Sequence, residues 1–114
     1  MPYIDAKLSV SLTQQKEKEI KQKLGEAIEC IPGKSEQWLM VQLEENCCLY
    51  FQGTNDQPSA MVEVKIFGKA EDSAYDAMTA AVTEILSSEL EIPASRIYVK
   101  YEECSHWGWN GNNF

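Results

Sequence analysis

Hydrophobic and polar residues alternate along two short stretches of the chain, which a shift of 58 residues brings into register by placing Ile4 on Val62. The apolar positions fall on every second residue, at Ile4, Ala6, Leu8, Val62, Val64 and Ile66. A period of two with one apolar face is typical of a half-buried β-strand. The pattern therefore predicts strands over 4–8 and 62–66.

Apolar residues recur at helical spacing in the segment that follows each predicted strand. They are Ile20, Leu24, Ala27, Ile28 and Ile31 in the first half, and Met78, Val82, Ile85 and Leu86 in the second. Ser11 with Gln14, and Ser73 with Asp76, are candidate pairs for the starts of these helices. Gly33 marks the end of the first helix.

The same shift aligns a second pair of strand-like segments, 39–45 and 97–103. Each half then has the order strand, helix, strand, and a helical crossover makes the two strands of a unit parallel. We expect a single domain over 1–114 with an internal duplication, 1–58 and 59–114. The predicted fold class is α/β (α+β), with two pseudo-symmetric β-α-β units forming a four-stranded mixed sheet and two helices on one face.

The opposite face of the predicted sheet carries Asp5, Lys7, Glu63 and Lys65, which suits a wet surface rather than a dry core. Residues 49–51 are interpreted as a further short strand, followed by a turn-rich loop over 52–58. The tail 107–114 holds three large aromatic residues, so we expect it to pack on the rest of the molecule or on a neighbouring subunit. Two edge strands and this tail favour self-association.

Composition and charge narrow the class of protein. Hydrophobic residues make up 44% and charged residues 25% of the chain, as in ordinary globular proteins. The net charge of -8 argues against nucleic acid and anionic membranes as main partners. No segment approaches the roughly 20 apolar residues of a membrane helix. The amino-terminal segment lacks the basic and then apolar order of a signal peptide, so we predict a cytoplasmic location.

The four cysteines, Cys30, Cys47, Cys48 and Cys104, form no Cys-x-x-Cys pair and are expected to be free thiols.

Pro2 is the most informative candidate for chemistry. Initiator methionine is usually removed before a small residue such as proline, which would leave Pro2 as a free secondary amine. An α-amino group has a pKa near about 8, and burial or a nearby cation lowers that pKa toward the range of a general base. Without further signals, the favoured interpretation of Pro2 is a neutral start of a strand.

Further motifs accompany the Met1-Pro2 start: Gly33-Lys34, Phe67-Gly68-Lys69, Arg96-Ile97-Tyr98-Val99, Gly108-Trp109-Asn110 and Phe114. Their joint order, from Met1 to Phe114, resembles the macrophage migration inhibitory factor family of the tautomerase superfamily. The resemblance implies a homotrimer whose sites lie between neighbouring subunits. It also implies keto–enol tautomerisation of a small aromatic α-keto acid such as phenylpyruvate, without metal or organic cofactor.

The resemblance also assigns roles to residues of this chain. Pro2 would be the catalytic general acid/base, Lys34 would bind the substrate carboxylate, and the backbone N–H of Phe67 would hold the same group. The aromatic frame of the pocket would be Trp38, Tyr98, Trp109 and Phe114. Taken singly, Lys34 is a solvated cation at a helix end, and Trp38 and Tyr98 are core or interface aromatics.

The sequence departs from the family pattern in two places. Ser59 and Val62 stand where animal members carry a Cys-x-x-Cys pair, so a thiol-disulfide oxidoreductase is not expected. Lys100 stands where those members have asparagine, two residues after Tyr98. Either Lys100 brings a second cation to the substrate pocket, or it points into solvent.

Two rival functions remain open. The first is a cytokine-like signalling protein, released without a signal peptide, that binds a host receptor and keeps only vestigial tautomerase activity. The second is an isomerase of unsaturated dicarboxylates or a dehalogenase, activities that rely on additional arginines. Arg96 is the only arginine of the chain, which weighs against the second rival.

Overall fold

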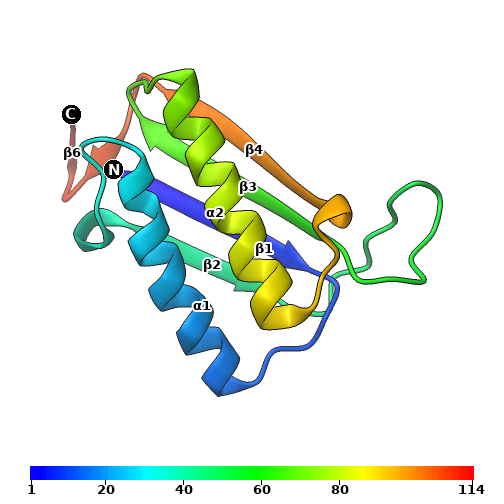
Figure 1. Ribbon diagram of the computed structural model, residues 1–114. Coiled ribbons are helices and arrows are strands. Elements are labelled where there is room, and N and C mark those ends of the chain that lie inside the picture. The colour runs from blue at the N-terminus through cyan, green and yellow to red at the C-terminus, as the bar shows by residue number, and fades with distance from the viewer.

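The computed structural model describes residues 1–114, along which a β-α-β segment occurs twice in succession (Figure 1). The elements of the first segment are β1 (Pro2–Leu8), α1 (Gln14–Ala27) and β2 (Met40–Glu44). Those of the second are β3 (Ala60–Phe67), α2 (Asp72–Leu90) and β4 (Ile97–Cys104). Two very short strands, β5 (Gly108–Trp109) and β6 (Asn112–Asn113), end the chain.

The four main strands form one sheet in the order β2-β1-β3-β4. Strand β1 runs parallel to β2, β3 runs parallel to β4, and the two central strands are antiparallel to each other. Pro2 is opposite Ile66, which in turn is opposite Glu103. The predicted four-stranded mixed sheet is confirmed.

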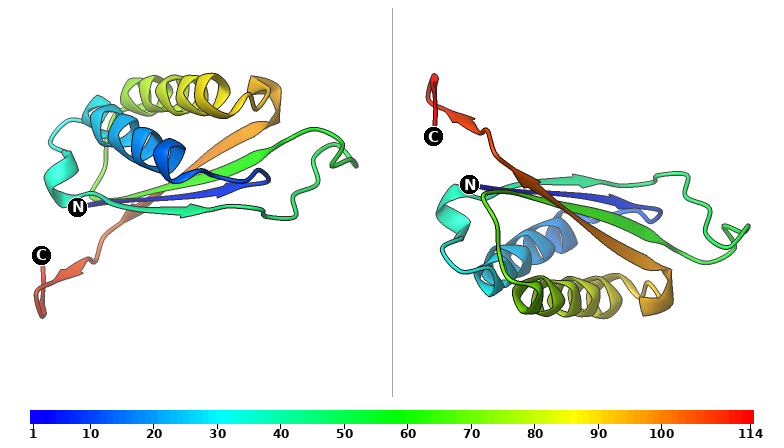
Figure 2. Two further views of the ribbon diagram at one scale, coloured as in Figure 1. Left: turned by 90° about the horizontal axis from the view of Figure 1, so that it is seen from below. Right: turned by 90° about the horizontal axis from the view of Figure 1, so that it is seen from above.

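Both helices cover the same face of the sheet, as predicted (Figure 2). The alternating apolar residues of β1 and β3 point towards the helices, and Ile4, Val62 and Val64 are fully buried. The helical stripes meet them from the other side, so that Ile20 and Met78 are also fully buried. The core therefore lies between the sheet and the two helices, while the other face of the sheet is left open.

The two helix starts differ from those predicted. The cap of α1 is Thr13, whose hydroxyl accepts a hydrogen bond from the Lys16 N–H at 3.1 Å. Ser11 instead donates to Asn46 Oδ1 at 2.8 Å, because the loop after β2 packs beside it. Glu71 precedes α2, and no side chain caps that helix.

The predicted strand over 49–51 is wrong. Only Phe51 takes part in pairing, in an isolated antiparallel bridge with Thr54. The two residues between them, Gln52 and Gly53, have φ values of 54° and 79°, so the chain reverses at once and no partner strand runs alongside. The segment is a tight turn within a long loop.

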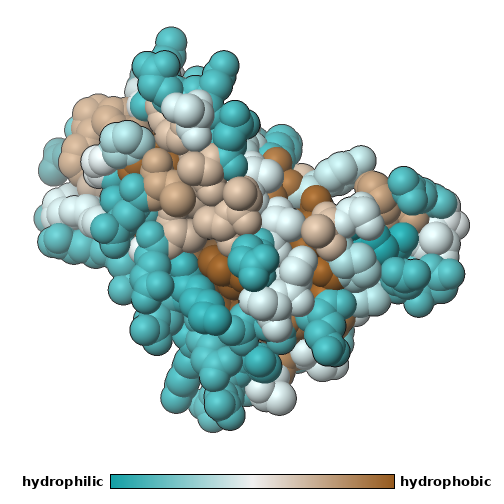
Figure 3. Space-filling model, in the orientation of Figure 1, coloured by the Kyte–Doolittle hydropathy of each residue, from teal (hydrophilic) through white to brown (hydrophobic).

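The helix-covered face is unevenly hydrophilic. Figure 3 shows hydrophilic colouring over α1 and a paler, more apolar area over α2. Ala77 and Ala80 contribute exposed small side chains to α2, whereas the exposed side of α1 is rich in lysine and glutamate. No helix of the structure combines the length and the apolar character needed to span a bilayer.

Candidate active site

Pro2 begins β1 and is buried at the end of the sheet where the carboxyl-terminal tail also lies (Figure 2). Met1 precedes it, so the Pro2 nitrogen is part of a tertiary amide, which has neither a proton nor a basic lone pair. The carbonyl of Met1 accepts a hydrogen bond from the Phe67 N–H at 3.0 Å. The N–H group that the family resemblance assigns to the substrate carboxylate is therefore held by Met1.

Lys34 follows a turn in which Gly33 has a φ of 82°, a backbone conformation that favours glycine. This turn directs the Lys34 side chain back over the end of β3. Its Nζ donates to the Phe67 carbonyl at 2.8 Å, and the residue is half-buried. Lys34 is therefore not a freely solvated cation at a helix end.

The α-amino group of Met1 reports the electrostatics of this region. Burial is the largest cause that lowers the pKa of this amine below its ordinary value of 8.0, and the positive charge of Lys34 is the next. Both causes disfavour the protonated form of an amine. An amine at this end of β1 therefore has a lower pKa than a solvent-exposed chain terminus and is more often unprotonated at neutral pH.

Aromatic side chains gather around this end of the sheet. Trp38 contacts Trp109 edge to face, with ring centroids 5.0 Å apart. The Trp109 and Phe114 rings are stacked at 6.3 Å, and Phe114 lies 5.9 Å from Phe67. The tail thus packs on aromatic residues of its own chain, which is one of the two alternatives expected.

Trp38 owes its place to the short 3₁₀ turn Glu36–Trp38, which leans on α1. Glu36 pairs with Lys21 at 3.6 Å, and its carboxylate lies directly over Gly25. A β-carbon on Gly25 would collide with that carboxylate. The absence of a side chain at Gly25 therefore lets the turn approach the helix closely.

A groove of about 960 Å³ opens between Pro2, the edge strand β2 and the tail. Most of its lining is apolar, and it includes Pro2, Tyr3, Trp38, Met40, Trp107 and Trp109. Sequence reasoning missed Tyr3, Met40 and Trp107 as lining residues. Met40 was detectable, since it lies on a predicted edge strand two residues after Trp38 and is 69% exposed.

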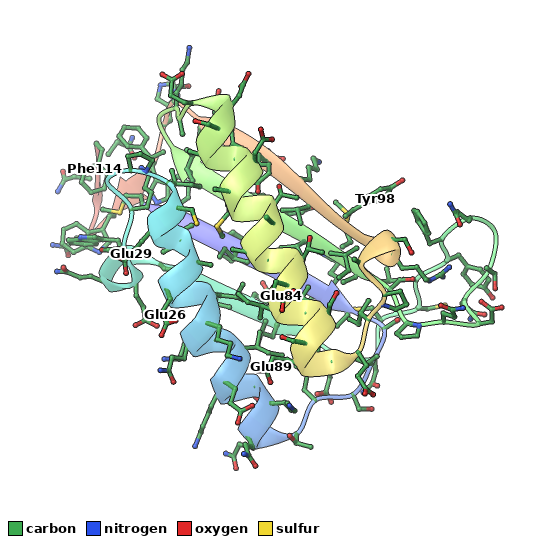
Figure 4. All side chains as sticks on the ribbon, viewed as in Figure 1. Glu26, Glu29, Glu84, Glu89, Tyr98 and Phe114 are labelled. Atoms are coloured by element: carbon green, nitrogen blue, oxygen red, sulfur yellow. The ribbon has the colours of Figure 1, made fainter.

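Of the predicted site residues, Pro2, Trp38 and Trp109 line this groove, and Lys34, Phe67 and Phe114 lie beside it. The other two, Tyr98 and Lys100, lie away from it. Tyr98 is opposite Met61 near the start of β4, whereas Pro2 is in register with Glu103 near the end of that strand. Figure 4 shows Tyr98 and Phe114 at opposite ends of the sheet. One chain thus brings together six of the predicted residues and leaves Tyr98 and Lys100 outside; the six are Pro2, Lys34, Trp38, Phe67, Trp109 and Phe114.

Lys100 lies on the open face in the middle of β4, opposite Glu63. Its Nζ is 3.9 Å from a Glu102 carboxylate oxygen, and about half of its side chain is exposed. Nearby on the same face, Lys7 forms a closer ion pair with Asp5, at 2.6 Å. Lys100 is therefore solvated within a single chain.

Comparisons with known proteins identify the family and support the fold. The sequence profile of the family described as Macrophage migration inhibitory factor (MIF) matches residues 1–114. Macrophage migration inhibitory factor of Mus musculus is 30% identical over 98 residues, covering 84% of this chain and 81% of the mouse protein. The crystal structure of MIF2 from Leishmania major has a TM-score of 0.92 at 35% identity, covering 100% of this chain and 97% of that one.

A homologue from Prochlorococcus marinus, 32% identical, has a TM-score of 0.80 with 98% of both chains covered. The match of the profile spans the whole chain, and the sheet, the helices and the tail all have counterparts in these solved structures. The chain belongs to the macrophage migration inhibitory factor family.

Proposed function

We propose that this protein is a cytoplasmic, homotrimeric keto–enol tautomerase for small aromatic α-keto acids such as phenylpyruvate. The observation that carries the proposal is the position of the amino terminus. The Met1 α-amino group lies near Lys34 and beside a groove lined by aromatic side chains. An amine with a lowered pKa can exchange protons at neutral pH, and a lysine can anchor an anionic substrate.

Removal of Met1 would have two consequences at once. It would turn the Pro2 amide into a secondary amine in the environment that lowers the pKa of the Met1 amine. It would also free the Phe67 N–H, which now donates to the Met1 carbonyl. The base and one donor for the substrate carboxylate therefore become available in the same processing step.

The reaction then needs few groups. Lys34 and the Phe67 N–H bind the carboxylate, and the aromatic groove receives the ring of the substrate. The unprotonated Pro2 amine takes a proton from the carbon next to the keto group, and the protonated amine then gives a proton to the carbonyl oxygen, directly or through water, to form the enol. The amine is thereby returned to its unprotonated form, and the reverse reaction moves a proton from the enol oxygen back to carbon by the same route.

The proposal includes a trimer because the pocket of one chain lacks two of the predicted site residues. Tyr98 and Lys100 lie too far along the sheet to meet Pro2 of their own chain. A neighbouring copy that presented its β4 to the open groove would supply both residues. The exposed apolar side chains around the groove support such a neighbour, since Trp109 is 51% and Met40 69% exposed.

The test is an intact-mass measurement and a phenylpyruvate assay on the same preparation. Active protein is expected to lack the mass of Met1, and a variant that retains a residue before Pro2 is expected to be inactive. Full activity in protein whose mass includes Met1 would contradict Pro2 as the base.

The alternative function, cytokine-like signalling through a host receptor, is supported by the 30% identity to the mouse macrophage migration inhibitory factor. The two functions separate in one variant. Lys34→Ala should abolish most tautomerase activity, whereas a response that depends on a receptor and not on the pocket should persist in that variant.

A further inference from the structure

Arg96, the only arginine of the chain, is buried at the far end of the sheet from Pro2. Its Nε donates to Ser59 Oγ at 2.9 Å and to the Pro58 carbonyl at 3.2 Å. The two terminal nitrogens donate to the carbonyls of Thr54 at 2.8 Å and Phe51 at 3.4 Å. A single side chain thus contacts the loop 51–59 at four positions.

No carboxylate lies within ion-pair distance of this guanidinium, although the protein has a net charge of -8. The buried charge is instead met by carbonyl and hydroxyl oxygens of one loop, together with the Phe51 ring 5.5 Å away. A guanidinium can do this because it has five N–H donors in a fixed plane, which an ammonium lacks. The arrangement therefore fixes the shape of the loop rather than neutralising an acid.

The loop 51–59 fixes the position of the Phe51 ring. The Phe51 ring lies edge to face against Tyr98, with centroids 5.1 Å apart and an interplanar angle of 86°. Tyr98 itself is 62% exposed, so the pair stands at the surface of the molecule. Arg96 contacts Phe51 twice, by a hydrogen bond to the Phe51 carbonyl and by a cation–π contact with the Phe51 ring. Phe51 in turn packs against Tyr98.

The pair cannot serve the groove of its own chain. Tyr98 is five residues along β4 from Glu103, the position in register with Pro2. At about 3.3 Å per residue this separation is about 17 Å, more than a tyrosine side chain can span. If Tyr98 contacts a substrate, that substrate is bound at Pro2 of another copy.

We propose that Arg96 is a positioning residue that holds the loop 51–59, and that Phe51 is a specificity residue. Together they set the aromatic wall that each subunit presents to the substrate bound at Pro2 of a neighbouring subunit. The proposal rests on the proposed tautomerase function and adds Phe51 and Arg96 to the residues that determine its preference for aromatic substrates.

The loop is tested without any assay of activity. Arg96→Lys keeps the charge but loses the planar donors, and Ser59→Ala removes one acceptor only. Hydrogen exchange at the amides of Phe51 and Thr54, which pair with each other, should become at least about tenfold faster in Arg96→Lys and change less in Ser59→Ala. Val82→Ala, a core variant in α2, is the control for general destabilisation. Exchange at the two amides that changes no more in Arg96→Lys than in Val82→Ala would overturn the role of Arg96.

The specificity role is tested by steady-state kinetics of Phe51→Leu. Loss of an edge-to-face contact should raise KM for phenylpyruvate by about three- to tenfold with little change in kcat. The kcat/KM for an aliphatic α-keto acid, 4-methyl-2-oxopentanoate, should change by less than about twofold. If the role of Phe51 were purely structural, kcat/KM would fall by a similar factor for both substrates, and that result would overturn the assignment of Phe51.

The location in a neighbouring subunit is tested by mixing two variants. Phe51→Leu chains retain Pro2 and Lys34, while Lys34→Ala chains retain Phe51 and Tyr98. After the two are unfolded and refolded together, some sites combine the intact Lys34 of one chain with the intact Phe51 of another. A fraction of the active sites in the mixed oligomers should then bind phenylpyruvate with the wild-type KM. If Phe51 contacted the substrate of its own chain instead, no site would combine an intact Lys34 with an intact Phe51, and none would regain the wild-type KM.

The outcomes separate this inference from the proposed function. Wild-type protein that lacks Met1 and has no tautomerase activity contradicts the proposed function, and with it the assignment of Phe51. Active wild-type protein with unchanged selectivity in Phe51→Leu contradicts the inference alone.

Discussion

At the scale of single residues, Lys34 has the most clearly defined place, because its only hydrogen-bond acceptor is the Phe67 carbonyl at the end of β3. A charge-assisted hydrogen bond to a substrate carboxylate contributes about 1.5–3 kcal/mol. Lys34→Ala should therefore lower kcat/KM for phenylpyruvate by about 10- to 100-fold. The exposed Lys69 provides the matched control, and Lys69→Ala should leave kcat/KM unchanged.

The same variant has a pH signature. The charge of Lys34 lowers the pKa of an amine at this end of β1, so its removal should raise the pKa of the Pro2 amine. The protonated amine is not a base, and the acidic limb of kcat/KM should therefore move to higher pH in Lys34→Ala. A limb that stays in place while activity falls would show that Lys34 binds substrate without tuning the base.

Lys100 gives a second prediction at this scale. If a neighbouring copy brings Lys100 to the pocket, its charge also lowers the pKa of the Pro2 amine there and attracts a second anionic group. In Lys100→Asn the acidic limb should move to higher pH, and any preference for dicarboxylate over monocarboxylate keto acids should shrink. Lys18→Asn, on the exposed side of α1, is the control. An unchanged profile would place Lys100 in solvent, where a single chain leaves it.

The residues differ in how far the sequence could predict them. Pro2 was a candidate because it follows Met1, and the family resemblance added Lys34 and Phe67; the structure brings the three residues together. Arg96 entered the sequence analysis as part of one family motif and as an argument against other activities, but its contacts were not predicted. Its acceptors are three backbone carbonyls and a serine hydroxyl. Backbone acceptors leave no trace in the sequence, so the contact between Arg96 and the loop 51–59 could not be predicted.

At the scale of elements, α1 and α2 are joined by an acidic residue between two lysines. Glu89 of α2 accepts hydrogen bonds from Lys23 and, at 2.9 Å, from Lys16 of α1, and only 10% of its side chain is exposed. The hydrogen bonds from Lys23, followed by those from Lys16, lower the pKa of Glu89 from 4.5 to about 2.

This shift makes the contact between the helices dependent on pH. A folded-state pKa below the unfolded value stabilises the fold above pH 4.5, and the stabilisation is lost as pH falls towards about 2. The urea midpoint of the wild type should exceed that of Glu89→Gln at about pH 6, and the difference should shrink by about pH 3. The neighbouring Glu91→Gln is a control in an exposed residue. An equal difference at both pH values would contradict a role for the Glu89 charge.

Elements with a strong hydrophobic period were predictable, and irregular segments were not. The alternation in 4–8 and 62–66 led to the right strands because one face of each strand is buried by helices. The interpretation of 49–51 as a strand failed because its apolar residues have no partner strand, only a turn closed between Phe51 and Thr54. The cap of α1 was placed at Ser11 rather than Thr13, because a tertiary contact with Asn46 competes for the Ser11 hydroxyl.

At the scale of the whole molecule, the two ends of the sheet are unlike. One end holds Pro2, the groove and the tail, and the other holds Arg96, Phe51 and Tyr98. Both ends expose aromatic rings, and neither is a complete pocket. The proposed homotrimer, in which one end of the sheet meets the other end of a neighbouring sheet, would cover both ends. It would also bring Tyr98 of one chain towards Pro2 of another.

The tail tests this view of assembly. Trp109 and Phe114 pack on Trp38 and Phe67 of their own chain, yet both remain more than half exposed. The wild type should have about three times the chain mass of 12.9 kDa by light scattering. Removal of 107–114 should lower that mass and reduce kcat/KM, because one wall of the groove and part of the interface leave together.

A matched control exists within the tail itself. Asn110 has a φ of 52° in the turn between β5 and β6, a conformation that glycine adopts without cost. Asn110→Gly should therefore keep both the mass and the activity, whereas Trp109→Ala should reduce activity more than assembly, since it removes one ring of the groove and leaves the rest of the tail. If the truncated chain remained a fully active trimer, the tail would be neither a wall of the groove nor part of the interface. The exposed side chains of Trp38 and Met40 would then have to be covered by the neighbouring subunit alone.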